Sequence, residues 1–192
     1  MAAEDHGGLD DVLLAAQAGR PAGLRAVYEQ LAPQVHGYLR ARGAGEPEDL
    51  TSEVFLTVFS RLATVTGGAA GLRTLVFSVA HARLVDDLRR QSRRGTTVPY
   101  EDWHDGRVSA SSEDEAVERS RTDEVRALLD ELPAEQRDVL LLRLVADLSV
   151  EQTAEAVGKS TGAVKQLQRR GLVALRGRLT DGVPVDLVSV IP

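Results

Sequence analysis

The chain has 192 residues, of which 23 are Lys or Arg and 29 are Asp or Glu, so its formal net charge is −6. It contains no cysteine, which excludes disulfides, thiolate metal sites and a cysteine nucleophile. This length allows one domain or two small ones. The acidic N-terminal sequence has no long apolar run, so we expect no signal peptide, no membrane insertion and a cytoplasmic location.

Four helical stretches are predicted in the first half of the chain. The first covers about residues 9–18, and the second begins at Pro21, a residue that suits a first helical turn. The third begins near Pro47, with acidic residues in its first turn, where the helix dipole favours them. A glycine-rich loop at 64–71 precedes the fourth, at 72–94. Apolar residues recur at spacings of three and four, which predicts a helical bundle.

The second half begins with an acidic linker at residues 93–120, which is rich in Gly, Pro, Ser and acidic residues. Helical periodicity then returns, and Pro133 is expected to start a helix. Ser149 is expected to cap the next one, with Gln152 in the reciprocal capping-box position, and Gly158 is expected to end it. The predicted fold class is all-α, with two small helical domains joined by a flexible acidic linker.

The segment after Gly158 is basic, with no Asp or Glu between Glu155 and Asp181. A short helix, a tight turn and a basic helix form the helix-turn-helix layout, whose second helix enters the major groove of DNA. Gln and Arg suit bidentate contacts with adenine and guanine. The alternative is a solvated basic face. The residues expected to contact upstream DNA are Lys159, Ser160, Thr161, Lys165, Gln166, Arg169 and Arg170.

Two blocks of the sequence resemble bacterial sigma factors. "LDELPAEQRDVLLLRLVADLSVEQTAEAVGKSTGAVKQLQRRGLVALRGRL" is similar to their region four. "VYEQLAPQVHGYLRARGAGEPEDLTSEVFLTVFSRL" and "GLRTLVFSVAHARLVDDLRRQSRR" are similar to the two parts of region two. Both blocks occur in the family order, without a third domain. The chain therefore resembles the small extracytoplasmic-function class, with an actinobacterial-like last helix.

This resemblance implies a transcription initiation factor that is not an enzyme and needs no cofactor or metal. Its partners would be core RNA polymerase, through the beta-prime clamp and the beta flap, promoter DNA, and an anti-sigma factor. It would recognise minus-ten and minus-thirty-five elements and aid promoter melting. The implied divisions are region 2 at 9–92, the linker at 93–120, region 4 at 121–180 and a C-terminal tail at 181–192.

The resemblance also implies site residues in the first half. Small residues Gly67, Gly68 and Ala69 would let an extruded base approach the backbone. Leu75 and Ala82 stand where the family usually has tryptophan and asparagine, which leaves the minus-ten preference open. The residues implied to bind core polymerase are Glu48, Asp49, Ser52 and Glu53, and those implied to bind the downstream element are Arg73, His81, Arg83, Arg89 and Arg90.

Three alternatives belong to other classes. A dimeric response regulator would carry a receiver domain ahead of the helix-turn-helix, and no such strand pattern occurs in the first half. An enzyme would show a nucleophile–base pair, a phosphate loop or metal-ligand spacing, whereas the histidines here are scattered. An interaction protein that has lost DNA binding is favoured by Leu75 and Ala82.

Overall fold

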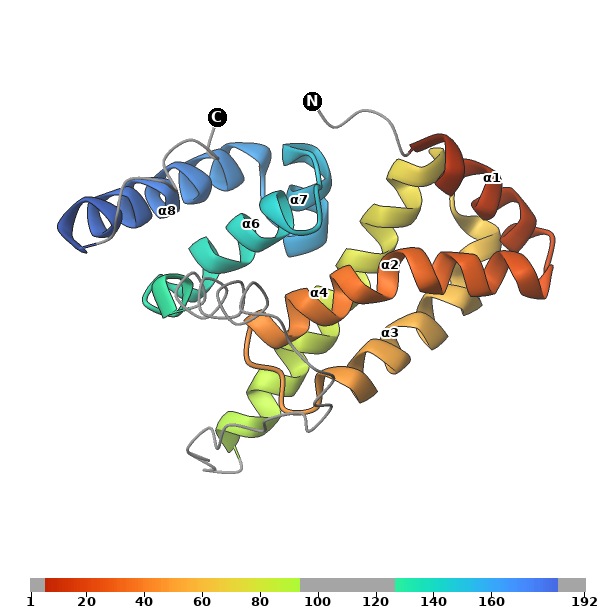
Figure 1. Cartoon of the computed structure of the whole chain (residues 1–192), viewed down its shortest axis with the longest axis horizontal. Helices are drawn as coiled ribbons and strands as arrows, with labels where there is room; N and C mark the ends of the chain where they lie inside the picture. Colours follow the sequence, from red (N-terminus) through yellow and green to blue (C-terminus); the bar gives the residue numbers. More distant parts are fainter. Residues whose placement is uncertain (1–5, 94–126, 183–192) are drawn as a thin grey trace, which may run out of the picture.

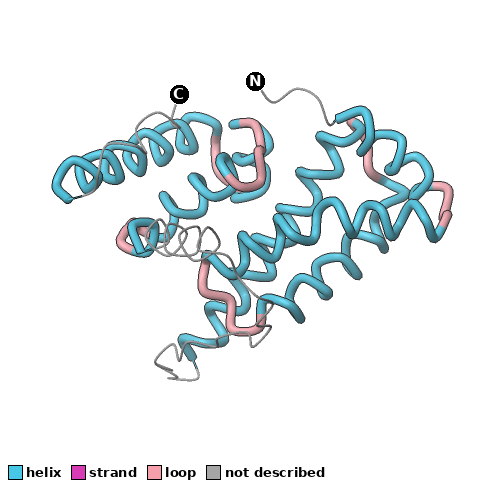
Figure 2. The backbone as a smooth tube through the Cα atoms, viewed as in Figure 1, coloured by secondary structure: helices cyan, strands magenta, loops and turns pink. Residues whose placement is uncertain are grey.

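The computed structural model describes residues 6–93 and 127–182, and the side chains within 8–93 and 127–177. These residues form helices and connecting turns without a strand, which confirms the expected all-α class (Figure 2). The linker prediction from residue 94 onward lies outside the described residues, as does the tail prediction from residue 183.

The first domain is a helical bundle. Its second and third helices begin at Pro21 and Pro47, as the sequence predicts. Buried Val27, Val54 and Phe77 come from three different helices of one core. The elements are α1 (His6–Gln17), α2 (Pro21–Ala41), α3 (Pro47–Arg61), η1 (Leu62–Thr64) and α4 (Gly68–Arg93).

The start of α4 differs from the sequence expectation. The helix begins at Gly68, inside the segment predicted to be a loop. The Asp10 side chain of α1 accepts a hydrogen bond from the Ala69 N–H at 2.5 Å. A Cβ atom on Gly68, whose φ is +62°, would lie 2.4 Å from Asp10 Oδ1. Gly68 and Ala69 are therefore in the first turn of a helix packed on α1, and the prediction that the loop extends to residue 71 is wrong. The predicted approach of an extruded base to this backbone stays a prediction.

The second domain contains a helical turn at 127–130 and three further helices. Pro133 lies directly before the first of these, close to the predicted start. The predicted short helix followed by a long basic helix is present. The elements are α6 (Ala134–Leu144), α7 (Val150–Val157) and α8 (Thr161–Gly182).

The two domains pack against each other. Figure 1 shows α6 and α7 beside α2 and α4, with α8 on the outer side of this group. Buried residues of both domains, including Leu72 and Phe77 of α4 and Leu140 and Leu142 of α6, belong to one apolar cluster. The sequence predicts two tethered domains and gives no indication of this shared core.

Candidate nucleic-acid and polymerase interfaces

The helix-turn-helix unit is fixed by local capping. Ser149 Oγ accepts the Gln152 N–H at 3.1 Å, and Gln152 Oε1 accepts the Ser149 N–H at 2.7 Å, which is the predicted capping box. Gly158 ends α7 with a φ of +65°, a conformation that glycine adopts without strain. The chain turns there and begins α8 at Thr161.

The outward face of α8 agrees with the sequence pattern. Val164 is buried in a small cluster with Val139 of α6 and Ala154 of α7, which fixes the rotation of α8. The predicted upstream-element residues of α8 therefore point to solvent. The exposed members are Ser160, Thr161, Lys165, Gln166, Arg169 and Arg170.

Lys159 differs from the rest of this set. Its Nζ lies 2.7 Å from Glu135 Oε1 of α6, and its side chain is 32% exposed. A phosphate contact by Lys159 must therefore compete with an ion pair inside the domain. Because the pair is partly exposed, its own contribution to stability is small.

Gly171 brings α8 close to α6. A Cβ atom at this position would lie 2.8 Å from Leu140 Cδ1 and 3.2 Å from Leu140 Cγ. Glycine weakens a helix interior by about 1 kcal/mol relative to alanine. Here the absence of a side chain allows α8 to pack closely against α6, and this packing offsets the low helix propensity of glycine.

The predicted downstream-element residues do not share one face of α4. His81 and Arg83 are two residues apart, which is a rotation of about 200° around a helix. Arg83 faces α3, where its Nη2 donates to Thr57 Oγ1 at 3.2 Å and its Nη1 lies 3.8 Å from Glu53 Oε2. Arg89 and Arg90 are exposed near the end of the helix.

Arg73 and His81 face the second domain. Arg73 Nη2 donates to Gln34 Oε1 at 3.0 Å and to the Ala146 carbonyl oxygen at 3.1 Å. Gln152 Nε2 of α7 donates to the Ala70 carbonyl oxygen at 2.8 Å, so the same end of α4 is contacted twice. This part of the predicted DNA surface is occupied by the second domain.

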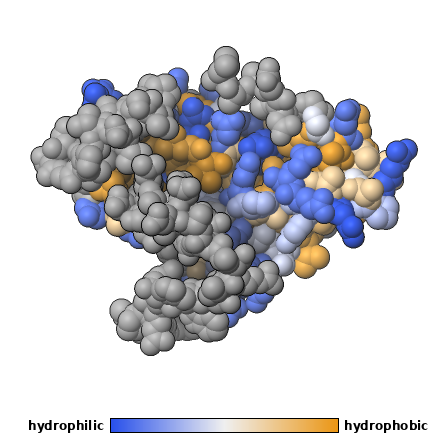
Figure 3. Space-filling model, in the orientation of Figure 1, coloured by the Kyte–Doolittle hydropathy of each residue, from blue (hydrophilic) through white to orange (hydrophobic). Residues whose placement is uncertain are grey.

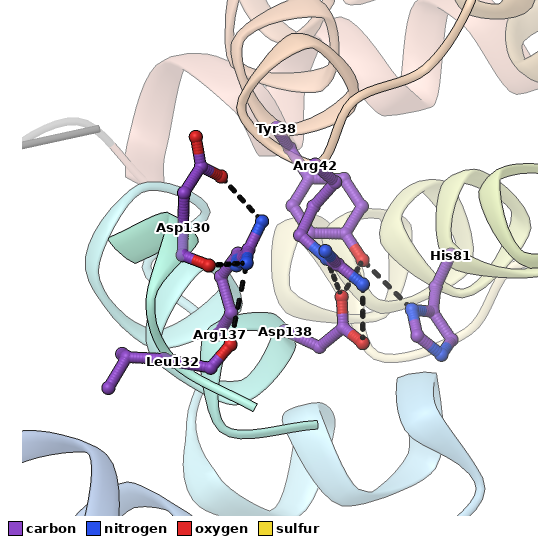
Figure 4. Close-up of polar contacts among 7 residues, drawn as sticks. All are labelled: Tyr38, Arg42, His81, Asp130, Leu132, Arg137 and Asp138. Carbon is purple, nitrogen blue, oxygen red and sulfur yellow. Dashed lines mark hydrogen bonds and ion pairs between the residues drawn. The ribbon is translucent and has the colours of Figure 1, made fainter. Parts of the chain in front are cut away.

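A buried polar cluster joins the domains, and we call Tyr38, Arg42, His81 and Asp138 the interdomain network. Arg42 Nε donates to Asp138 Oδ1, and Arg42 Nη2 donates to Asp138 Oδ2 at 3.3 Å. The Tyr38 hydroxyl donates to Asp138 Oδ1 at 3.4 Å and is hydrogen-bonded to His81 Nδ1 at 2.8 Å. Figure 4 shows the Asp138 carboxylate facing both Arg42 and the Tyr38 hydroxyl, with His81 beside that hydroxyl.

The electrostatics of the network follow from its burial. Burial raises the pKa of Tyr38 well above its ordinary value, and the neighbouring Asp138 charge raises it further. Burial lowers the pKa of His81 from its ordinary value of 6.5, against the opposing effect of Asp138. At neutral pH the Tyr38 and His81 side chains are therefore uncharged, and they lie beside the Arg42–Asp138 ion pair.

No pattern in the sequence predicts the interdomain network. Tyr38 and Arg42 lie 100 and 96 residues before Asp138, so no local pattern connects them. One signal was present: Asp138 directly precedes the apolar run 139–142, all of which is buried. A carboxylate beside a buried stripe requires a partner, because an unpaired buried charge is very costly.

The predicted polymerase-binding residues lie on the exposed side of α3. Glu48 Oε1 is 2.9 Å from His36 Nε2 of α2, and this hydrogen bond is the main reason why the pKa of Glu48 is lowered. Asp49, Ser52 and Glu53 are exposed. Leu56, which the sequence analysis did not single out, is 72% exposed and follows them at helical spacing.

Neither a metal-binding cluster nor a membrane-spanning helix is found in the described parts of the chain. Within them, no group of three or more His, Cys, Asp or Glu side chains is arranged to hold a metal ion. None of the described helices has the length and apolarity that a membrane crossing requires.

Comparisons with known proteins agree with this architecture. Residues 27–94 match the Sigma-70 region 2 family, and residues 128–177 match the Sigma-70, region 4 family. The ECF RNA polymerase sigma factor SigD of Mycobacterium tuberculosis is 35% identical over 181 residues, which cover 89% of this chain and 84% of SigD. SigX of Bacillus subtilis is 32% identical over 143 residues, covering 72% of this chain and 73% of SigX.

The fold is also found in a solved structure, that of CnrH in complex with the cytosolic domain of CnrY. It has a TM-score of 0.64 and 16% sequence identity, and the match covers 90% of this chain and 97% of the solved one. At this identity the likeness concerns the fold. The sequence relatives establish the family: this chain belongs to the ECF RNA polymerase sigma factors, transcription initiation factors that bind core RNA polymerase and direct it to promoters.

Proposed function

We propose that α8 reads the upstream promoter element, that α4 contacts the downstream element, and that the exposed side of α3 binds core polymerase. The region boundaries 9–92 and 121–180 belong to this proposal. The observation that carries it is the basic face of α8. Lys165, Gln166 and Arg169 are exposed just after a tightly capped turn, where a recognition helix contacts base edges.

The chemistry of these side chains supports a division of roles. Arg169 and Gln166 suit base edges, because a guanidinium or an amide can make two hydrogen bonds to one base. Lys165 and Arg170 suit phosphates, which position the protein without reading sequence. Ser160 Oγ accepts the Ala163 N–H at 3.2 Å and so helps to cap the start of α8.

The exposed stripe on α3 supports a protein partner. Asp49, Ser52, Glu53 and Leu56 follow one another at helical spacing and are exposed. DNA phosphates would be repelled by the carboxylates, whereas the basic surface of a polymerase subunit would attract them. The partner assigned to this stripe is the beta-prime clamp of core polymerase, and region 4 is assigned to the beta flap.

For the downstream element, the proposal has two parts. Arg83 contacts DNA phosphates from the side of α4 that faces α3, and Arg89 and Arg90 contact them from the exposed end of the helix. Arg73 and His81 join them when region 4 moves away. The five predicted downstream-element residues are then distributed around α4 and do not form one continuous basic surface along it.

An anti-sigma factor is the proposed regulatory partner. Figure 3 shows a hydrophobic area over α6, and at the end of this helix Leu144 is 60% exposed next to exposed Val145. A partner recovered from cells by affinity purification, then purified and titrated, is expected to bind Leu144→Asp more weakly than the unchanged chain. Equal binding would exclude this hydrophobic area as the binding site of the partner.

The proposed site of action is the cytoplasm, and the chain itself catalyses no reaction.

The central test is transcription by core polymerase and this chain from a library of promoters. The expected result is enrichment of two separated sequence elements. Arg169→Ala should relax the preference at the upstream element, losing about 1–3 kcal/mol of discrimination at one base pair. The matched control is Arg25→Ala, which removes an exposed arginine of α2 outside every proposed site. Equal loss across all upstream sequences would make Arg169 a phosphate contact instead.

A further inference from the structure

The interdomain network buries most of a charged pair at the boundary between the domains. The Arg42 side chain is 7% exposed and that of Asp138 is 11% exposed. Each charge has its opposite across the boundary between the two domains. We call the packing of the two domains against each other the closed arrangement. When the domains separate, both charges return to water, so the Arg42–Asp138 pair exists only in the closed arrangement.

The closed arrangement also covers part of α4. Arg73 donates to the Ala146 carbonyl oxygen, and the His81 ring is hydrogen-bonded to Tyr38 beside Asp138. Both residues belong to the proposed downstream-element set. While region 4 is in place, these side chains are engaged by protein rather than available to a DNA strand.

The dimensions of the closed chain can also be compared with the spacing of the two promoter elements. Elements at minus ten and minus thirty-five are about 25 base pairs apart, which is about 85 Å at about 3.4 Å per base pair. The longest described helix, α4, has 26 residues and is about 39 Å long. Because α7 packs on α4 and α6 is bonded to α2 through Asp138 and Arg42, the closed domains cannot reach both elements at once.

We propose that this closed arrangement is an autoinhibited state of the sigma factor, held by the buried Arg42–Asp138 pair, and that promoter binding requires the pair to separate. This inference rests on the proposed function of α4 and α8. Core polymerase opens the chain by holding region 2 and region 4 at separate sites. Before assembly, the closed chain has little access to promoter DNA.

The experiment measures closure and DNA binding on the full-length chain. The chain has no cysteine, so Gln30→Cys on α2 and Val173→Cys on α8 accept a fluorescent donor and acceptor at exposed positions outside the network. Energy transfer then reports the distance between the domains. The DNA probe is a labelled duplex carrying a promoter selected in the library experiment.

Asp138→Asn is expected to lower energy transfer and to raise the affinity of the polymerase-free chain for the duplex. An increase of about tenfold corresponds to an open population of about one tenth before the substitution. Arg42→Asp combined with Asp138→Arg re-pairs the charges and should restore both high transfer and weak binding. Adding core polymerase should lower transfer in the unchanged chain.

The matched control is Asp130→Asn. Asp130 Oδ1 accepts from Arg137 Nη1 at 2.6 Å within region 4, so its loss removes a pair without touching the domain boundary (Figure 4). Transfer and DNA affinity should stay unchanged. Circular dichroism of every variant checks that the helices persist, and the charge exchange distinguishes opening from misfolding.

The results separate the two proposals. Unchanged transfer in Asp138→Asn, or opening without stronger DNA binding, overturns the autoinhibited state while holoenzyme transcription remains intact. A wild-type holoenzyme that selects no promoter overturns the proposed function and the inhibitory role together. In that case energy transfer still shows whether Arg42 and Asp138 hold the chain closed.

Discussion

The two helices proposed to contact DNA differ in what surrounds their polar side chains. On α8, Lys165, Gln166 and Arg169 are exposed, because Val164 holds the opposite face against α6 and α7. On α4, Arg73 and His81 contact the other domain. The sequence assigns both helices to DNA, but the structure makes one surface available and occupies part of the other. Whether a polar side chain is available to DNA therefore depends on how the two domains pack as well as on the residue type.

The largest expected effect comes from breaking the contact that occupies α4. Asp138→Ala leaves Arg42 without its partner, and removing one member of a buried pair costs the closed arrangement about 3–5 kcal/mol. Opening of the domains returns Arg42 to water and limits the loss of stability to the free energy of domain closure, which urea unfolding followed by circular dichroism measures. The control Asp130→Ala removes a partly exposed pair and should cost about 0–1 kcal/mol. Equal losses in the two variants would show that the Arg42–Asp138 pair has no special role.

A double substitution sharpens this prediction. Arg42→Met with Asp138→Leu replaces both charges by apolar side chains of similar size, which often restores or exceeds the original stability. The double variant should therefore unfold at a higher urea concentration than Asp138→Ala. If it is as unstable as the single variant, the loss comes from packing rather than from the orphaned charge.

A smaller effect should distinguish the two DNA surfaces by their salt dependence. Removing one phosphate contact lowers the slope of log affinity against log salt by about 1. In the polymerase-free chain, Lys165→Ala should have this effect, whereas Arg73→Ala should not, because Arg73 is engaged by Gln34 and Ala146. Fluorescence anisotropy with a promoter duplex at several salt concentrations measures both slopes.

The same measurement in the Asp138→Asn background completes the comparison. Once the domains separate, Arg73→Ala should also lower the slope. An Arg73 effect of full size in the unchanged chain would mean that α4 is already accessible, contrary to the closed arrangement.

Local chemistry explains which parts of the fold were predictable. Pro21 and Pro47 begin helices, and Ser149 with Gln152 forms a capping box, because these preferences depend on a few neighbouring residues. The exposed face of α8 was predictable for a similar reason: the helical period alone separates Val164 from Lys165 and Arg169.

The missed features all depend on residues distant in sequence. The first turn of α4 is capped by Asp10, which lies 59 residues before Ala69. Arg42 and Asp138 are 96 residues apart, and each alone has the character of an exposed charge. Periodicity and propensity describe one segment at a time, so they predicted neither the earlier start of α4 nor the closed domains.

A third prediction concerns the packing that aligns the α8 surface. Gly171→Ala places a methyl group 2.8 Å from Leu140 Cδ1, and such overpacking typically costs about 1–3 kcal/mol. The gain in helix propensity offsets about 1 kcal/mol of this. A net loss of about 1 kcal/mol is expected in urea unfolding. Gly177→Ala is the control on the same helix, since a Cβ atom there meets no atom within 4 Å, and it should be neutral or stabilising.

The smallest expected effect is a pH dependence of domain closure. Burial lowers the pKa of His81 below 6.5, and the Arg42 and Lys159 charges lower it further, while Asp138 opposes them. Between this lowered pKa and 6.5, an exposed His81 binds more protons than the buried one. The closed state is therefore favoured at higher pH and weakens as the pH falls through this window.

Energy transfer in the labelled chain, recorded from about pH 7.5 to about pH 5.5 across the ordinary titration range of histidine, tests this direction. Transfer should fall towards the acidic end in the unchanged chain and should fall less in His81→Gln, which keeps a polar side chain beside Tyr38 without titrating. The lowered pKa of Glu48 acts below 4.5 and does not contribute in this window. Closure that strengthens on acidification would mean that His81 gains a proton in the closed state and that Asp138, rather than burial, controls its titration.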